Sequence, residues 1–135
     1  MRDISFIQGS SSLSKIIVEE TQQFYDLGLK IGILCGSSEI LESVDQVLWT
    51  QKQISFIPHA TQNDSNPELQ PVYISVDFNF PNSPHVLLCV ECAPIESVFQ
   101  KEVIIFSPTS NFLESIRQYY RSLSDSAHKV TFTKE

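Results

Sequence analysis

Apolar positions along the chain follow two periods, which predict alternating strands and helices. The short apolar run Ile4–Ile7 is followed by Gly and Ser residues, as at the end of a strand. From Leu13 the apolar residues recur at helical spacing up to Gly28, which stands where a left-handed helix cap is expected. This pattern predicts a helix over residues 13–27. The run Leu29–Cys35 is almost wholly apolar, which is typical of a strand covered on both faces.

The rest of the chain continues the alternation. Further strands are expected at Ile54–Ile57, Val72–Val76, Val86–Val90, Val103–Phe106 and His128–Thr133. Further helices are expected at residues 38–49 after an N-cap at Ser37 or Ser38, near Ile95–Gln100, and from an N-cap at Thr109 or Ser110 to about Leu123. Alternating apolar and polar positions predict that the strand at 72–76 is half exposed and that the last strand is a sheet edge. Strand–helix–strand units at both ends predict one α/β domain over residues 1–135, a three-layer structure with a mostly parallel sheet flanked by helices.

Length and composition limit the class of protein. With 135 residues, 41% of them hydrophobic and only four Gly, the chain is expected to fold around a substantial core. Its longest apolar runs are far shorter than the roughly 20 residues of a membrane span, and its first residues do not resemble an export signal. We therefore expect a cytoplasmic protein that does not interact with membranes. Three cysteines, an odd number, also suit a reducing compartment.

Charge is unevenly distributed. The whole chain has a net charge of −7, which disfavours direct binding to a nucleic-acid backbone, but residues 117–134 hold four basic residues against one acidic residue. Within this segment, Arg117, Tyr120 and Arg121 have the i, i+3, i+4 spacing of one helix face. With Lys129 nearby, this face suits a short acidic peptide with an aromatic end, because arginine binds carboxylates and tyrosine packs against a ring.

The position of the face formed by Arg117, Tyr120 and Arg121 also allows an alternative interpretation. This face is expected to lie roughly opposite the apolar stripe of the same helix. That stripe comprises Phe112, Ile116, Tyr119 and Leu123. The alternative interpretation is an ordinary solvated face in which Glu114 pairs with Arg117.

A second candidate surface contains the only tryptophan. Trp49 stands at the end of a predicted helix, and Phe56 and Pro58 lie on or beside the strand that follows. Aromatic residues at such positions either pack inward or anchor a partner. Because the strand has apolar residues on both faces, an uncovered patch is plausible beside the inward packing that the pattern alone favours.

Two chemical alternatives are weaker. The turn Gly36–Ser38 follows a buried strand and precedes a helix, where α/β folds bind phosphate, but the glycines of a phosphate loop are missing. A small enzyme or nucleotide-binding protein would use this turn, with His59 as a possible base. Cys89 and Cys92 form a CxxC pair that lacks further metal ligands at suitable spacing, so buried thiols are favoured over a metal-binding module. We expect no cofactor and no metal.

Four segments together form a recognisable set of motifs: Leu29–Cys35 (LKIGILC), Val44–Trp49 (VDQVLW), Ser55–His59 (SFIPH) and, less specifically, Arg117–Arg121 (RQYYR). Through these segments the sequence resembles the chi subunits of bacterial DNA polymerase III, and the resemblance covers nearly the whole chain. It implies a non-catalytic accessory protein with a nucleotide-binding-like α/β fold that has no phosphate loop.

The resemblance further implies two partners. One is the psi subunit, which connects chi to the clamp loader, and its contact would fall on Trp49, Phe56 and Pro58. The other is the acidic C-terminal tail of single-stranded DNA-binding protein, whose pocket would be formed by Arg117, Tyr120 and Arg121. Relatives often carry a lysine early on the last helix, where this chain has Leu113 and Glu114, so we expect either a lower affinity for the tail or the use of Lys129 in place of that lysine. DNA would then be reached only indirectly.

Overall fold

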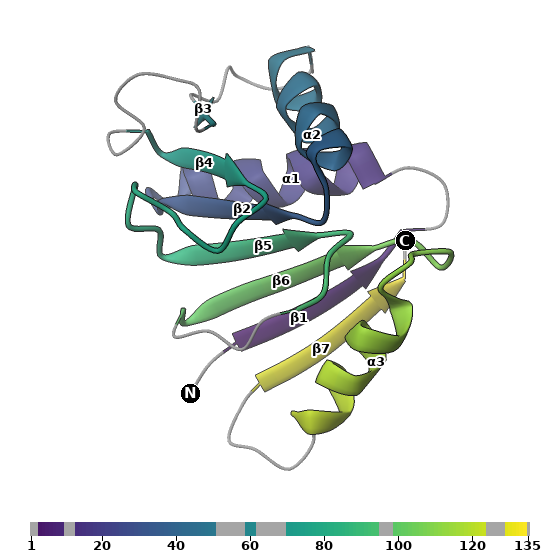
Figure 1. The fold of residues 1–135 in the computed structure, drawn as a ribbon. Helices are drawn as coiled ribbons and strands as arrows, with labels where there is room; N and C mark the ends of the chain where they lie inside the picture. The colour runs from purple at the N-terminus through teal and green to yellow at the C-terminus, as the bar shows by residue number, and fades with distance from the viewer. Residues whose placement is uncertain are drawn as a thin grey trace.

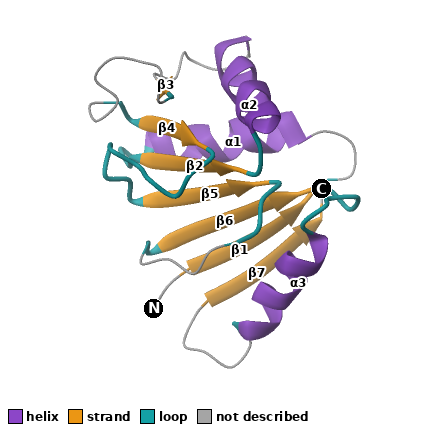
Figure 2. Ribbon diagram, in the orientation of Figure 1, coloured by secondary structure: helices purple, strands orange, loops and turns teal. Residues whose placement is uncertain are grey.

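The computed structural model describes residues 3–9, 13–50, 59–61, 70–94, 99–123 and 129–134, without the side chains of residues 49, 50, 59, 60 and 129. Three helices and seven strands are found in these ranges (Figures 1 and 2). In chain order they are β1 (Asp3–Gln8), α1 (Leu13–Asp26), β2 (Ile31–Cys35), α2 (Ser38–Thr50), β3 (His59–Ala60), β4 (Val72–Ser75), β5 (Val86–Val90), β6 (Lys101–Phe106), α3 (Leu113–Ser122) and β7 (Lys129–Lys134). None of the helices in these ranges is long and apolar enough to cross a bilayer.

The strands form one sheet in the order β3-β4-β2-β5-β6-β1-β7. Every pairing between the described strands is parallel. The register places Phe6 of β1 beside Phe132 of β7, and Gln8 beside Lys134. The strand at the end of the chain is therefore an edge strand, as its alternating pattern predicts.

Helices cover both faces of the sheet, which confirms the predicted three-layer α/β fold (Figure 1). One hydrophobic core lies under α1 and α2, with Ile17 and Val44 packed against the central strands. The other lies under α3, where Ile116 and Leu123 cover Phe6 and neighbouring side chains of β1, β5 and β6. The consistently buried strands explain the near-continuous apolar runs in the sequence.

The helix ends follow local rules in two cases and depart from them in a third. Gly28 adopts φ +78°, and the amide of Leu29 donates to the carbonyl of Phe24 at 3.1 Å, so α1 ends in the expected left-handed cap. Ser37 caps α2, since its hydroxyl accepts the amide of Ile40 at 3.3 Å. For α3 the predicted N-cap at Thr109 or Ser110 is wrong. The Ser110 hydroxyl accepts the Phe112 amide within a preceding turn, which delays the helix to Leu113.

One strand differs from its prediction, and two predicted elements are not tested. All four residues of β4 are buried, whereas the pattern predicted a half-exposed strand. The second face is covered because the ring of Phe80 packs on Tyr73, with 6.1 Å between centroids. The predicted strand Ile54–Ile57 and residues 95–98 of the predicted helix Ile95–Gln100 lie outside the described residues.

Candidate functional site

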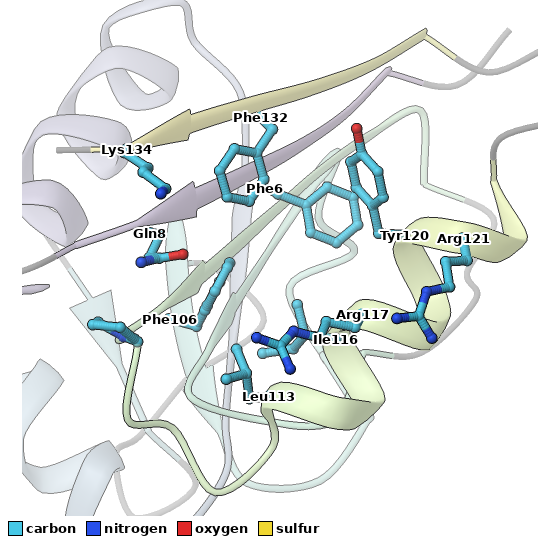
Figure 3. Close-up of a pocket in the computed structure, with 11 residues that line it drawn as sticks. Phe6, Gln8, Phe106, Leu113, Ile116, Arg117, Tyr120, Arg121, Phe132 and Lys134 are labelled. Atoms are coloured by element: carbon cyan, nitrogen blue, oxygen red, sulfur yellow. The ribbon is translucent and has the colours of Figure 1, made fainter.

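A pocket of about 640 Å³ lies between α3 and the carboxyl-terminal parts of β6, β1 and β7 (Figure 3). Its floor is apolar, formed by the buried side chains of Phe6, Phe106 and Ile116. Two exposed rings stand above this floor. Tyr120 is 43% exposed and Phe132 is 46% exposed, and their centroids are 6.2 Å apart in an edge-to-face arrangement. Large apolar surface left open in this way is a feature of binding sites.

Cationic side chains from two elements surround this floor. Arg117 and Arg121 come from α3, and Lys134 comes from the end of β7 (Figure 3). All three side chains are exposed. Arg121 lies 4.0 Å from the carboxylate of Glu114, and since both side chains are about two-thirds exposed, water and salt screen this pair.

The ion pair differs from the one that the solvated-face interpretation proposed. Glu114 pairs with Arg121, two helical turns away, and not with Arg117. Arg117 makes no ion pair with any residue in the described part of the chain. Neither arginine is buried, so both guanidinium groups remain accessible to a ligand at this rim.

The structure places Tyr120 closer to the core than the sequence analysis predicted. A four-residue step turns an α-helix by one turn plus about 40°, so Tyr120 lies near Ile116 and not opposite it. The Tyr120 ring packs edge-on against Phe6, with 5.2 Å between centroids. Arg117, Tyr120 and Arg121 therefore border the apolar stripe, which is why cations and an apolar floor meet in one pocket.

Sequence reasoning missed part of the pocket. Lys134 and Phe132 were not selected, although their spacing of two places them on one face of a strand. The position of β7 beside β1 brings this face to α3, and no local pattern predicts that pairing. The backbone of Lys129, the predicted fourth cation, lies in β7, but its side chain is outside the described residues.

The second predicted surface is not tested. Trp49 lies in the last turn of α2, and its side chain is not described. Phe56 and Pro58 lie outside the described residues. The role of all three residues stays a prediction.

The backbone is closely packed at the turn around Gly36, which connects β2 to α2. A side chain at Gly36 would bring its Cβ to 2.0 Å from the carbonyl oxygen of Glu91, so glycine is needed there for packing. The neighbouring groove of about 160 Å³ is lined by one titratable side chain, Glu91. That carboxylate already accepts the amide of Ser107 at 2.6 Å. The described part of this turn thus gives no support to a phosphate or acid–base site.

The three cysteines are buried and free, as expected for structural thiols. Burial raises the pKa of Cys35 from its ordinary value of 9.0 to about 12, with a smaller contribution from Cys92. A hydrogen bond between the Cys89 and Cys92 thiols, which favours protonated Cys89, together with burial, raises the pKa of Cys89 well above 9.0. The two thiols meet because β5 ends at Val90 and Glu91 turns the chain with φ 48°.

No group of three or more potential metal ligands occurs within the described ranges. Cys92 donates a weak hydrogen bond to the carbonyl of Leu34 at 3.6 Å. This contact and the burial of Cys89 are features of a packed core. A reactive thiol needs a lowered pKa and access to solvent, and Cys89 has neither.

Comparison with known proteins decides the family. The family model described as DNA polymerase III chi subunit, HolC, matches residues 1–131. The chain belongs to this family. A relative from Rickettsia prowazekii (strain Madrid E), named probable DNA polymerase III subunit chi, is 31% identical over 106 residues. The match covers 77% of this chain and 64% of that relative. The match with this chi-family chain thus spans less than two-thirds of that relative's length.

Proposed function

We propose that this chi-family protein is a non-catalytic adaptor that binds the acidic C-terminal tail of single-stranded DNA-binding protein in the pocket between α3 and β7. The observation that carries the proposal is the meeting of Arg117, Arg121 and Lys134 around an apolar floor that lies beneath two exposed aromatic rings. In a chain of net charge −7, such a local excess of positive charge selects an anionic ligand. The same role would place the protein in the cytoplasm, with DNA reached only through the bound protein.

The ligand's chemistry follows from the pocket. Guanidinium groups bind carboxylates through charge-assisted hydrogen bonds, and Lys134 adds a flexible point charge. The exposed edges of Tyr120 and Phe132 accommodate an aromatic or large aliphatic side chain above Phe6. An acidic tail that ends in an aromatic residue satisfies both requirements, whereas a nucleic-acid strand would be repelled by most of the remaining surface.

The contact should be modest in strength. The pocket is small compared with a standard protein–protein interface, and its charges remain partly hydrated. We expect a dissociation constant in the micromolar range, about 8 kcal/mol of binding free energy. Such an affinity suits a contact that forms and breaks as replication proceeds.

Calorimetry tests the pocket directly. The ligand is a synthetic peptide of the last ten residues of the organism's own single-stranded DNA-binding protein. Arg117→Glu and Arg121→Glu should each weaken binding at least about 30-fold, because each replaces an attraction by a repulsion. Lys15→Glu makes the same change of charge on α1, over the other face of the sheet, and should leave the affinity within about twofold. Unchanged affinity in Arg121→Glu would refute the assignment of the pocket.

We also propose that the protein joins the clamp loader by binding a psi subunit through Trp49, Phe56 and Pro58. The support is the sequence pattern of these residues together with membership of the chi family. Co-expression of the chain with the organism's psi subunit should give a complex that survives gel filtration. Trp49→Ala should abolish that complex and leave tail binding intact, while Tyr120→Ala should have the opposite effects. A Trp49→Ala variant that still forms the complex would contradict this assignment.

A further inference from the structure

The outer edge of β7 has backbone groups available for pairing. Within the described residues, β7 pairs only with β1 and no strand lies on its other side. Alternate residues of a parallel strand direct their N–H and C=O groups to the same side, so half of this strand's groups point away from the sheet. Residues 131–134 all have exposed side chains. Such an edge is a template for an additional strand.

This edge adjoins the candidate pocket. The side chains of Phe132 and Lys134 lie on the α3 side of β7 and line the pocket (Figure 3). In the register of β1 and β7, Phe132 lies beside Phe6 and Lys134 lies beside Gln8, so two rows of neighbouring residues run across these strands. A strand added outside β7 would continue both rows. Its residue beside Phe132 and its residue beside Lys134 would be two positions apart and on the same face.

We propose that the acidic tail binds as an extended strand on the outer edge of β7, with alternate side chains directed to the pocket. The proposal rests on the proposed function and adds the mode of recognition. Backbone hydrogen bonds would hold the peptide, a large apolar side chain would contact Phe132 and Tyr120, and a carboxylate two positions away would pair with Lys134. Selectivity would therefore depend on the spacing of apolar and acidic residues as well as on total charge.

A second copy of the chain fits this edge less well. Two copies of β7 related by a two-fold axis would pair antiparallel and place both α3 helices on the same face of the joined sheet. This arrangement brings together the cations that line the two pockets, Arg117, Arg121 and Lys134 of each copy, and like charges in proximity destabilise such a pair. An acidic peptide instead complements the charge of the strand and of α3, where Arg117 and Arg121 stand.

Backbone methylation of the peptide tests strand pairing without altering the protein. The ten-residue tail peptide is prepared with one N-methyl group at a time, which removes an N–H donor and adds bulk at that position. We expect an effect with a period of two: at least about tenfold weaker binding at one position and less than about twofold change at its neighbour. Amide exchange measured by NMR should also slow for alternate residues of β7 when the unmodified peptide is added.

The outcomes separate this inference from the proposed function. Tight binding of the unmodified peptide without any periodic effect of methylation would overturn strand pairing and leave the pocket assignment standing. Failure of the unmodified peptide to bind would overturn both. A chain that is dimeric in solution, and becomes monomeric on Phe132→Glu, would show that a second copy occupies the edge and would also overturn the inference.

Discussion

The hydroxyl of Tyr119 donates a 2.7 Å hydrogen bond to the carboxyl group of Glu102, which is fully buried in β6. The ring of Phe6 lies beside both tyrosines of α3, with centroids 6.0 Å from Tyr119 and 5.2 Å from Tyr120. These contacts fix α3 against β6 and β1, the two strands next to β7 in the sheet. The helix that contributes Arg117 to the candidate site is therefore positioned by a polar contact in the core.

Tyr119→Phe removes the donor to Glu102 and keeps the ring. We expect the free energy of unfolding to fall by about 1–3 kcal/mol, because a buried carboxyl group loses a hydrogen bond. Urea denaturation measures the change. Tyr120→Phe is the matched control on the next residue, whose ring is 43% exposed, and should change stability by less than about 0.5 kcal/mol. Equal losses in the two variants would show that the hydrogen bond contributes nothing specific.

Gly36→Ala should be more destabilising than Gly28→Ala. The first substitution places a Cβ 2.0 Å from the Glu91 carbonyl oxygen and should cost at least about 2 kcal/mol, since this oxygen belongs to the backbone and cannot move aside as the end of a side chain could. The second meets no atom within 4 Å and costs only the strain of φ +78°, about 1 kcal/mol. Thermal and urea unfolding compare the two variants. A Gly36→Ala variant as stable as the wild type would mean that the turn is loose enough to rearrange around a ligand.

Salt should weaken tail binding. Arg117, Arg121 and Lys134 are exposed, so their attraction to carboxylates is screened as ionic strength rises. We expect affinity for the tail peptide to fall by about fivefold to tenfold between 50 mM and 500 mM NaCl. Fluorescence anisotropy with a labelled peptide gives the dependence. An affinity that does not change with salt would indicate that the apolar floor alone holds the peptide.

Alkaline pH should reduce stability through the buried thiols. The pKa of Cys35 is about 12 in the folded protein against an ordinary value of 9.0. A group whose pKa is raised on folding stabilises the fold fully below its unfolded pKa and loses this contribution as the pH rises toward the folded pKa. Above pH 9 the thiol should therefore lower the free energy of unfolding by up to about 1.4 kcal/mol per pH unit.

Cys35→Ala isolates this effect. Its free energy of unfolding should depend less steeply on pH between 9 and 10.5 than that of the wild type, while the other titrating groups are common to both proteins. The comparison uses the slopes, because the lost sulfur also changes packing. Identical slopes would contradict the raised pKa of Cys35.

Local patterns predicted the elements well where one physical rule acts alone. The left-handed cap at Gly28 and the serine cap at Ser37 depend only on nearby backbone groups, and both are found. The start of α3 was wrong because the Ser110 hydroxyl bonds the Phe112 amide inside a turn. The predicted half-exposure of β4 was wrong because Phe80, which lies beyond the end of the strand and outside its alternating pattern, covers the second face.

The candidate site was predictable only in part. The spacing of Arg117, Tyr120 and Arg121 selected a helix that lines the pocket, because charge and periodicity are visible in the sequence. The contributions of Phe132 and Lys134 depend on the parallel pairing of β7 with β1, which joins segments more than 120 residues apart. Such long-range pairing is set by the whole core and not by any local pattern.

Binding of the chain to intact and truncated single-stranded DNA-binding protein tests the central claim most directly. The immobilised chain is exposed to the intact protein and to a version that lacks its last ten residues, at equal concentrations. We predict micromolar binding of the intact protein and loss of binding on truncation. Equal binding of both forms would contradict the claim that the pocket between α3 and β7 captures an acidic tail.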